Sequence, residues 1–258
     1  MEIRIQNISF SYDQDTVINA LTTRFRPGIF HAVLGPNGCG KTTLMDIISG
    51  FLKPDRGSLF IGNRKISRLS KPRTAKLISL VSQNYTIGFP FTVKQVVMMG
   101  RHPHIGRFSR PSRNDYKKVD QAMEDTGISH LKNRKITQLS GGEKQRCVVA
   151  RSLCQDTPVL LLDEAFSNLD ICHTLNLLDL MKNRVLNPKK IIVSVLHDLN
   201  LAAAWADEML FLKQGRLISQ GGGDKVLTEK NIKEVFDVES KVEFNEHVQA
   251  KQVYYTNA

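Results

Sequence analysis

The stretch that decides the fold is GPNGCGKT, from Gly35 to Thr42. It matches the pattern G-x-x-x-x-G-K-[ST], in which glycines let backbone N–H groups converge on phosphate oxygens. A short apolar run before it, Ile29–Leu34, predicts a buried strand. Apolar residues at helical spacing after it predict a helix over Lys41–Ser49, with Gly50 placed to end that helix. Strand, glycine-rich turn and helix predict the opening of an α/β unit.

Each residue type in this loop has a chemical use. The N-terminus of the following helix attracts anions, Lys41 meets the β- and γ-phosphates, and the Thr42 hydroxyl meets Mg²⁺. Cys39 is not expected to be a nucleophile, but its thiol would make the site sensitive to alkylation. The residues expected to bind the nucleotide here are Gly35, Pro36, Asn37, Gly38, Cys39, Gly40, Lys41, Thr42 and Thr43.

A second apolar strand is predicted at Val159–Leu162, and it ends in two acids, Asp163 and Glu164. A carboxylate at the end of a buried strand can hold Mg²⁺ through water, and the next one can orient or deprotonate an attacking water. Many strands end in acids, so this pair becomes informative only together with the phosphate loop. The two features together predict nucleotide hydrolysis.

A third feature, LSGGE, spans Leu139–Glu143 and precedes a helix-like run over Lys144–Leu153. A Ser-Gly-Gly turn at a helix start offers a hydroxyl and N–H groups to an anion. The chain therefore carries two phosphate-binding helix starts, and one active site does not need both from the same copy. Two copies arranged head to tail would use both and would close symmetrically.

The remaining patterns predict a parallel sheet with an inserted helical region. A third apolar strand, Ile191–Leu196, resembles the first two, and continuous apolar strands indicate a parallel sheet covered on both faces. Other expected elements are a strand with a phase shift or bulge over Met1–Ser11, a mostly helical region over 92–152, a hairpin over Glu208–Gln220 turning at Gly215, a helix over Glu229–Phe236, and a short strand-forming end.

Composition and charge describe a soluble protein with a localised basic surface. The 258 residues are 41% hydrophobic and 24% charged, and no stretch predicts a secretory signal or a membrane span. The four cysteines form no CxxC pair, which favours a reducing compartment. Two stretches, 63–76 and 101–118, account for the whole net charge of +11. They indicate a surface that meets an anionic neighbour, which could be nucleic acid or the cytoplasmic leaflet of a membrane. The alternative is a basic face that is simply solvated.

The order of these motifs resembles the ATPase subunit of ABC transporters, over about residues 1–223. The resemblance implies ATP and Mg²⁺ as cofactors. It implies that Tyr12 stacks on adenine and that Gln83, in LVSQN, senses Mg²⁺, takes part in catalysis and contacts a permease. It also implies that the LSGGE motif of one copy reaches the γ-phosphate of the ATP on a second copy, in a head-to-tail ATP-sandwich dimer. The residues concerned are Ser140, Gly141 and Gly142.

The same resemblance assigns the remaining site residues. Asp163 would serve Mg²⁺ through water, beside the ligands Thr42 and Gln83, and Glu164 would be the catalytic base. Asp170, in SNLD, would be the D-loop residue, and His197, in SVLHD, would be the catalytic switch histidine on the γ-phosphate. Many family members carry Pro-Thr after the catalytic glutamate. Here Ala165 and Phe166 stand there instead, which bears on how the D-loop packs against the partner.

The implied fold is that of a P-loop NTPase of the ABC ATPase type. It is an α/β fold with a RecA-like core, an antiparallel β subdomain and an inserted helical subdomain. The expected division is an ATPase domain over 1–223, with its helical subdomain at about 92–152. Residues 224–258 would form a C-terminal helix and tail packed on the same domain.

The stretch MMGRHPHIGRF, Met98–Phe108, bears on the substrate class. His102 and His104 have a spacing that can chelate a metal, but no cysteine or carboxylate is close in sequence. Aromatic residues are few and not interleaved with the charges, so nucleic acid is not expected as a partner. The pattern G-R-x-P-H resembles the ATPases of importers for iron(III)-siderophores, haem and cobalamin, some of which handle molybdate.

That narrower resemblance implies import driven with a substrate-binding protein and transmembrane permease subunits. The chain would then be peripheral, on the cytoplasmic face of the cell (inner) membrane. The alternative is a soluble ABC ATPase of iron–sulfur cluster assembly, which is a single cassette of similar size.

Overall fold

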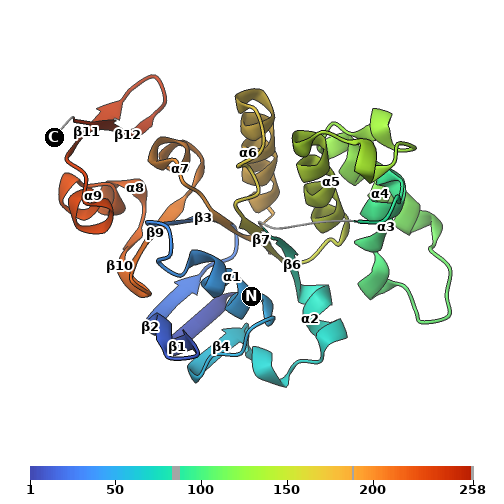
Figure 1. Cartoon of the computed structure of the whole chain (residues 1–258), viewed down its shortest axis with the longest axis horizontal. Coiled ribbons are helices and arrows are strands. Elements are labelled where there is room, and N and C mark those ends of the chain that lie inside the picture. Colours follow the sequence, from blue (N-terminus) through green and yellow to red (C-terminus); the bar gives the residue numbers. More distant parts are fainter. Residues whose placement is uncertain (83–87, 188, 257–258) are drawn as a thin grey trace. The chain divides into compact units, whose positions relative to one another are not determined.

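The structure is a computed structural model that describes residues 1–82, 88–187 and 189–256 (Figure 1). The chain divides into two compact units. The first combines Met1–Leu69 with Met181–Ala258, and the second is Ser70–Leu180. Each unit is described by itself below. Among the described residues, no helix combines the length and the apolar character needed to cross a bilayer.

The first unit contains a sheet in the order β10-β9-β3-β8. β3 pairs in parallel with both β8 and β9, as the continuous apolar runs predicted, and β9 and β10 form an antiparallel hairpin. Gly215 lies in its turn at φ 73°, which confirms the predicted turning point. The strands are β3 (Ile29–Leu34), β8 (Ile191–Val195), β9 (Glu208–Lys213) and β10 (Arg216–Gly221).

A second, antiparallel sheet of this unit has the order β2-β1-β4-β5. The phase shift in the first strand is a bulge: the register with β2 slips between Ile5 and Ile8, and Asn7 between them has φ 48°. The slip keeps both isoleucines in the core, where each is at most 1% exposed. The strands are β1 (Ile3–Tyr12), β2 (Asp15–Phe25), β4 (Arg56–Ile61) and β5 (Arg64–Lys65), and a 3-10 turn, η1 (Ile66–Arg68), follows.

The helices of the first unit follow its strands. α1 starts at Lys41 and ends at Ser49, with Gly50 at φ 77°, so the predicted bounds and stop are confirmed. The C-terminal part joins the core through Phe236, whose ring meets Phe211 edge to face at 5.4 Å. The further elements are α7 (Leu199–Trp205), α8 (Gly223–Val226), α9 (Glu229–Phe236) and the hairpin of β11 (Ser240–Asn245) with β12 (Ala250–Tyr255).

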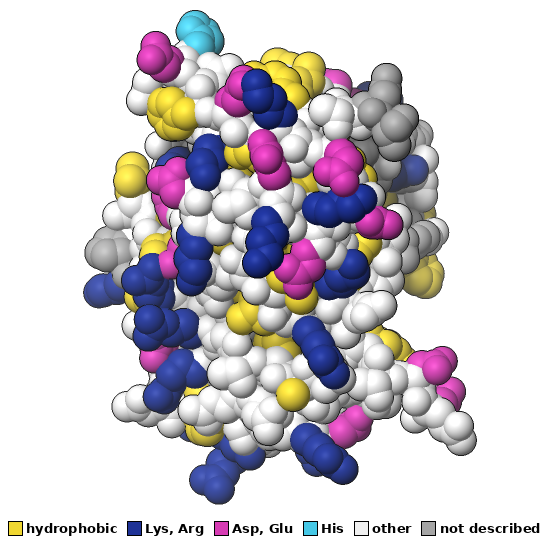
Figure 2. All heavy atoms as spheres, turned by 90° about the vertical axis from the view of Figure 1, so that its left-hand side faces the viewer, with side chains coloured by type: hydrophobic (Ala, Val, Ile, Leu, Met, Phe, Trp, Pro, Cys, Tyr) yellow, Lys and Arg dark blue, Asp and Glu magenta, His cyan; other side chains and the backbone are white. Residues whose placement is uncertain are grey.

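Figure 2 views the molecule from the left-hand side of Figure 1, where the C-terminal elements lie. Acidic and basic side chains alternate over the upper part of this face. Lys and Arg side chains gather at its lower left edge with few acids among them. Charge on this face is therefore mixed where the C-terminal elements lie, and the excess of basic side chains is confined to the lower left edge.

The second unit is mostly helical, as the pattern over 92–152 predicted. It also contains two parallel strands, β6 and β7, with Val81 opposite Leu162. Its elements are α2 (Lys71–Leu77), β6 (Ile78–Val81), α3 (Val93–Met99), η2 (His102–His104), α4 (Arg113–Asp125), η3 (Ser129–Leu131), η4 (Ile136–Gln138), α5 (Gly141–Cys154), β7 (Val159–Asp163) and the start of α6 (Ile171–Val185).

Candidate nucleotide site

The phosphate loop has the backbone that its glycines allow. Gly35 (φ 156°) runs so close to β9 that a Cβ there would lie 2.2 Å from the Leu212 carbonyl oxygen, and Gly40 (φ 101°) is left-handed at the start of α1. The Lys41 ammonium folds back over the loop and donates to the carbonyls of Gly35 (2.8 Å) and Pro36 (3.0 Å). The side chain is therefore held at the loop, where a phosphate would compete for it.

The turn between β9 and β10 is hydrogen-bonded to the phosphate loop. Gly215 N–H donates to the Cys39 carbonyl at 3.0 Å, and the Gly215 carbonyl accepts from Asn19 N–H at 3.0 Å. A Cβ at Gly215 would lie 2.2 Å from the Val17 carbonyl oxygen, so no larger residue fits in this turn. The sequence marked Gly215 as a turn but gave no sign that it fixes the phosphate loop.

Cys39 does not behave as the sequence suggested. Its side chain is 4% exposed, and burial raises the pKa of its thiol. Because the thiolate is the reactive form, burial argues against the expected sensitivity of this residue to alkylation. The exposed cysteine is Cys172, near the start of α6.

Strand register places His197 at the same sheet edge as the phosphate loop. Val33 lies opposite Val195 in the parallel pair of β3 and β8, and Leu196 N–H donates to the Val33 carbonyl at 3.2 Å. The loop and His197 both follow the carboxyl ends of these neighbouring strands, where ligands of open α/β sheets bind. Tyr12 ends β1, is 48% exposed, and meets Phe10 edge to face at 4.9 Å.

The two acids after β7 differ in their environment. Asp163 is 2% exposed at the end of the strand, whereas Glu164 is partly exposed and holds a left-handed φ of 51°. Non-glycine residues in that region cost roughly 1–3 kcal/mol and cluster at functional sites. The Glu164 carbonyl accepts from the N–H (3.3 Å) and the hydroxyl (3.0 Å) of Ser167, which fixes this turn.

Ser140 caps α5 in a reciprocal arrangement with Glu143. The Ser140 hydroxyl accepts from Glu143 N–H at 3.3 Å, and the Glu143 carboxylate accepts from Ser140 N–H at 2.8 Å. Hydrogen bonds from Ser140 lower the pKa of Glu143. A Cβ on the exposed Gly141 would meet no atom of the described part of the chain within 4 Å. The turn is thus well formed and leaves space in front of Gly141.

A contact that the sequence did not reveal joins this helix to the acid pair. The Gln145 amide donates to the Ala165 carbonyl at 2.9 Å, and Gln145 is 8% exposed. Ala165 and Phe166, which stand where many relatives have Pro-Thr, are both buried at 0% and 9% exposed. The two residues that replace Pro-Thr are therefore packed inside the subunit as apolar side chains.

Asp170 begins α6 as a cap. Its carboxylate accepts from the His173 N–H at 2.9 Å and meets the His173 ring at 2.9 and 3.0 Å, and these bonds lower the pKa of Asp170. Gln83 lies outside the described residues. The assigned nucleotide residues thus lie on both units: the phosphate loop, Tyr12 and His197 on the first, and Ser140, the acid pair and Asp170 on the second.

The G-R-x-P-H stretch is structural in this protein. The Arg101 guanidinium is 4% exposed, pairs with Asp115, and donates to the Cys154 carbonyl at 2.8 Å, at the end of α5. A Cβ on Gly100 would lie 2.2 Å from the Arg151 carbonyl oxygen, and the His104 ring bonds the Gln155 carbonyl at 2.8 Å. Counting Arg101 with the basic surface was therefore wrong, because its charge is buried and paired.

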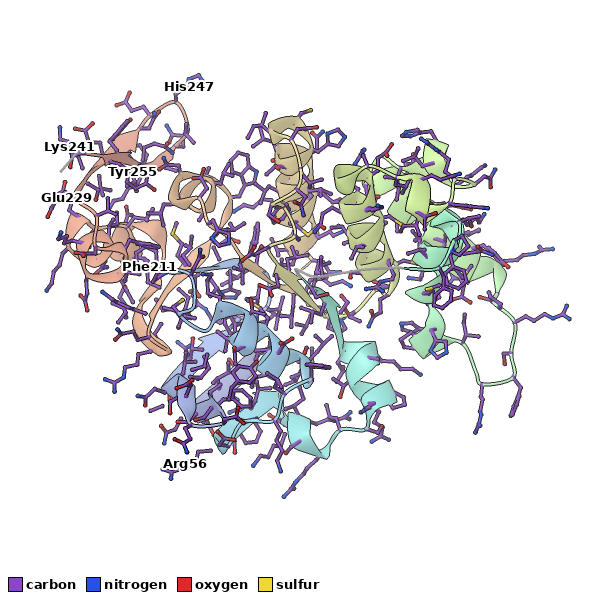
Figure 3. All side chains as sticks on the ribbon, in the orientation of Figure 1. Arg56, Phe211, Glu229, Lys241, His247 and Tyr255 are labelled. Atoms are coloured by element: carbon purple, nitrogen blue, oxygen red, sulfur yellow. The ribbon has the colours of Figure 1, made fainter. Side chains whose placement is uncertain are left out.

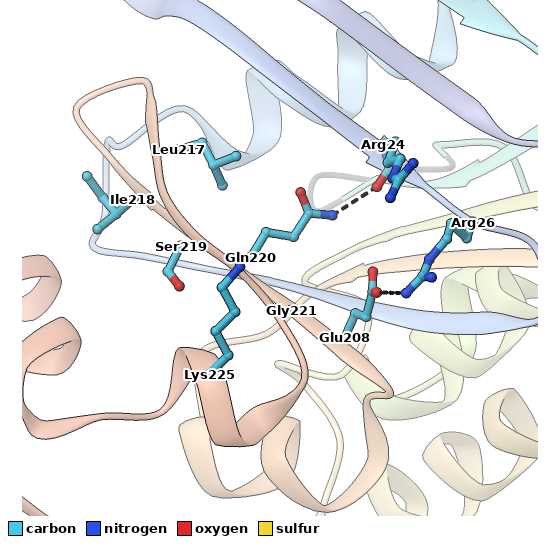
Figure 4. Close-up of a pocket in the computed structure, with 9 residues that line it drawn as sticks. All are labelled: Arg24, Arg26, Glu208, Leu217, Ile218, Ser219, Gln220, Gly221 and Lys225. Atoms are coloured by element: carbon cyan, nitrogen blue, oxygen red, sulfur yellow. Dashed lines mark hydrogen bonds and ion pairs between the residues drawn. The ribbon is translucent and has the colours of Figure 1, made fainter.

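One hollow of about 470 Å³ lies away from the phosphate loop (Figure 4). Glu208, the first residue of β9, forms an ion pair there with Arg26, and the Gln220 amide donates to the Arg24 carbonyl at 2.9 Å. These residues stand at the amino ends of the parallel strands, the edge opposite to Gly35. The hollow is therefore not the nucleotide site.

Comparison with known proteins decides the family. A family model described as ABC transporter matches residues 18–167, which is more than half of the chain. The chain belongs to the ABC transporter family. As an ABC ATPase it binds ATP and hydrolyses it. Its family membership confirms the expected fold class, and the phosphate loop, LSGGE and the acid pair all lie within the matched residues.

Three curated relatives are named as ATP-binding proteins of transport or import systems. The ferric enterobactin transport ATP-binding protein FepC of Escherichia coli is 36% identical over 91% of this chain and 86% of its own length. The hemin import ATP-binding protein HmuV of Thermobifida fusca is 37% identical over 92% and 82%. The cobalamin import ATP-binding protein BtuD of Halobacterium salinarum is 38% identical over 86% of this chain, which spans 55% of that longer protein.

Solved structures agree on the fold. A transporter assigned to the metal-chelate type, in an inward-facing conformation, superposes with a TM-score of 0.83 at 27% identity, covering 99% of this chain and 97% of its own. A dimeric bacterial ABC transporter cassette, MJ0796, gives 0.78 at 25% identity and covers 85% of this chain and 98% of its own. The shorter cassette therefore leaves about a seventh of this chain unmatched.

Proposed function

We propose that this ABC ATPase powers a binding-protein-dependent importer of metal chelates, with iron(III)-siderophores as the first candidate cargo. The observation that carries the proposal is the near full-length similarity to ATPases named for ferric enterobactin and hemin transport. Haem and cobalamin are the other candidates from these relatives, and molybdate remains a further one from the sequence pattern. A role in iron–sulfur cluster assembly has no support among the relatives described above.

Mg²⁺ fits the donors that the chain offers. The Thr42 hydroxyl is exposed in the first turn of α1, and Asp163 brings a buried carboxylate to the end of β7. Hydroxyl and carboxylate oxygens are the ligands that Mg²⁺ takes beside phosphates. Thr42 and Gln83 would hold the ion directly and Asp163 through water. The bound ion would neutralise charge on the phosphates, while Lys41 and His197 contact the γ-phosphate.

Glu164 is the proposed base for the attacking water. Its left-handed backbone is held by Ser167 and turns away from the strand that buries Asp163, which supports separate roles for the two acids. Glu164→Gln should keep ATP binding, abolish turnover and trap a dimer of two chains. Binding of a fluorescent nucleotide, phosphate release and light scattering measure the three effects. Normal hydrolysis by this variant would show that the base is another residue.

We infer a head-to-tail dimer in which Ser140 and its two glycines meet the ATP bound to the second copy. The exposed, reciprocally capped start of α5 supports this role, because its N-terminus favours anions and none of the described residues fills the space at Gly141. Ser140→Arg should keep ATP binding and stop hydrolysis. Ser129→Arg, an exposed serine on η3, is the control. Full activity of Ser140→Arg would exclude the arrangement.

The partners of this proposal are permease subunits and, through them, a substrate-binding protein, with the ATPase peripheral on the cytoplasmic face of the cell membrane. The decisive experiment is to co-purify the permease and measure ATP hydrolysis with binding proteins loaded with different chelates. Stimulation by a loaded siderophore-binding protein alone would support the proposed cargo. Stimulation only by a loaded cobalamin- or haem-binding protein would reassign it.

A further inference from the structure

The helix that follows His197 begins almost at once. α7 starts at Leu199, and the carboxylate of Asp198 caps it by accepting from the N–H groups of Asn200 (2.7 Å) and Leu201 (2.9 Å). His197 is therefore the residue between the last bond to the sheet, at Leu196, and the cap of the helix. Any shift of α7 moves the backbone of His197 with it.

The side chain of Asn200 on α7 hydrogen-bonds to the C-terminal hairpin. The Asn200 amide donates to the Val253 carbonyl at 3.2 Å and accepts from Val253 N–H at 2.7 Å, so both ends of the amide are used on one residue of β12. Only a carboxamide offers a donor and an acceptor side by side in this way. β12 packs against α7 along this contact (Figure 1).

The other side of the hairpin is fixed to α8 and α9. The Lys251 ammonium donates to the carbonyls of Asp224 (3.0 Å) and Leu227 (3.2 Å), and the Glu229 carboxylate accepts from Val242 N–H at 3.3 Å. Figure 3 shows Glu229 close below the hairpin and His247 at its far tip. The hairpin is thus hydrogen-bonded to the α8–α9 region on one side and to α7 on the other.

Burial does not explain why the hairpin lies there. Val253 is its one side chain among the buried hydrophobic residues, at 3% exposed, whereas Phe244, Tyr254 and Tyr255 are 58%, 49% and 60% exposed. Burying one valine stabilises the fold by roughly 1.5–3 kcal/mol. This is small beside the loss of backbone entropy when a whole hairpin becomes ordered.

We propose that Asn200 is a positioning residue for ATP hydrolysis: the C-terminal hairpin holds α7 through this side chain and thereby fixes His197 at the edge of the sheet that carries the phosphate loop. The inference rests on the proposed contact of His197 with the γ-phosphate. The Asn200 amide is bonded to Val253 through both its oxygen and its nitrogen, so Asn200 would act through His197. It acts on the chemical step because a misplacement of about 1 Å in a catalytic group can cost on the order of 100-fold in rate.

The first test removes the two hydrogen bonds between Asn200 and Val253. Asn200→Leu keeps the side-chain size and removes both bonds to Val253, so kcat should fall roughly 10-fold while KM for ATP stays within about twofold. Asn200→Asp keeps the acceptor for Val253 N–H and should lose less. Asn245→Leu, at the last residue of β11, instead removes the acceptor for the N–H groups of His247 and Val248; it is the matched control and should keep kcat. Thermal melting verifies that each variant is folded. If Asn200→Leu does not fold, Asn200→Asp decides the outcome.

The second test asks whether Asn200 acts through His197. In single-turnover experiments with full-length protein, Asn200→Leu should have no further effect once His197→Ala is present, because the group that it positions is gone. Multiplicative losses in the double variant, or an unchanged kcat in both Asn200 variants, would overturn the proposal. A normal rate for His197→Ala alone would instead show that the proposed role of His197 is wrong.

Discussion

The guanidinium of Arg101 lies 2.9 Å from the carboxylate of Asp115, and both residues are buried, at 4% and 8% exposed. The pair joins the turn after α3 to the start of α4, and the same guanidinium satisfies the carbonyl at the end of α5. Three helices of the second unit therefore meet at one charged contact. Buried charges are stable only when they are paired and hydrogen-bonded in this way.

Removing Arg101 should destabilise the protein strongly. Arg101→Met removes the partner of Asp115 Oδ1 and of the Cys154 carbonyl, while Ser112 still bonds Asp115 Oδ2. Breaking a buried ion pair in this way costs about 3–5 kcal/mol. Urea unfolding followed by circular dichroism measures the change. The control is Arg113→Met, an exposed residue on α4 that should change the free energy of unfolding by less than about 0.5 kcal/mol. Equal stabilities would mean that the pair contributes nothing.

The same contact should make stability fall in acid. Hydrogen bonds from Ser112 and Arg101 lower the pKa of Asp115 from the ordinary 3.8 to about 2. A pKa lowered by folding stabilises the native state above the ordinary value, and this contribution is lost as the pH falls from about 4 toward 2. The difference in unfolding free energy between wild type and Asp115→Asn should therefore shrink over that range. A difference that is constant between pH 6 and pH 2.5 would contradict the low pKa.

Alkylation should distinguish the cysteines by burial. At pH 7.5, N-ethylmaleimide should label Cys172 first, because it is exposed, and should leave Cys39 largely unmodified. Burial also raises the pKa values of Cys147 and Cys154 to about 12, so these should stay unlabelled too. Peptide mass spectrometry reads the order of labelling, and labelling in urea is the control for intrinsic reactivity. Labelling of Cys39 as fast as that of Cys172 would mean that the phosphate loop opens readily.

Gly141→Ala separates a role within the subunit from a role toward a second copy. An added Cβ meets nothing within 4 Å, so the free energy of unfolding should change by less than about 0.5 kcal/mol. If the second copy's ATP approaches this turn, hydrolysis should still fall severalfold. Gly223→Ala, whose Cβ would make only an ordinary contact with Met209, is the control. Unchanged hydrolysis in Gly141→Ala would argue against close approach of a nucleotide here.

The sequence by itself determined the local structure around the phosphate loop. The bounds of β3, α1 and α9, the bulge in β1 and the turn at Gly215 all follow from periodicity, glycine placement and turn chemistry. These signals act over a few neighbouring residues, which is why they can be read without a fold. The order of the motifs also predicted the family, and the continuous apolar runs predicted the parallel pairing of the strands.

Only the tertiary structure decided which side chains are buried and which distant residues bond. Arg101 and Cys39 look accessible in the sequence but are covered by other elements, and Asn200 and Gln145 look like ordinary polar helix residues. Asn200 finds its partner in Val253, 53 residues away, and Gln145 finds its partner in Ala165, 20 residues away. Hydrogen bonds between separate elements depend on how those elements pack, and no periodicity along the chain encodes that.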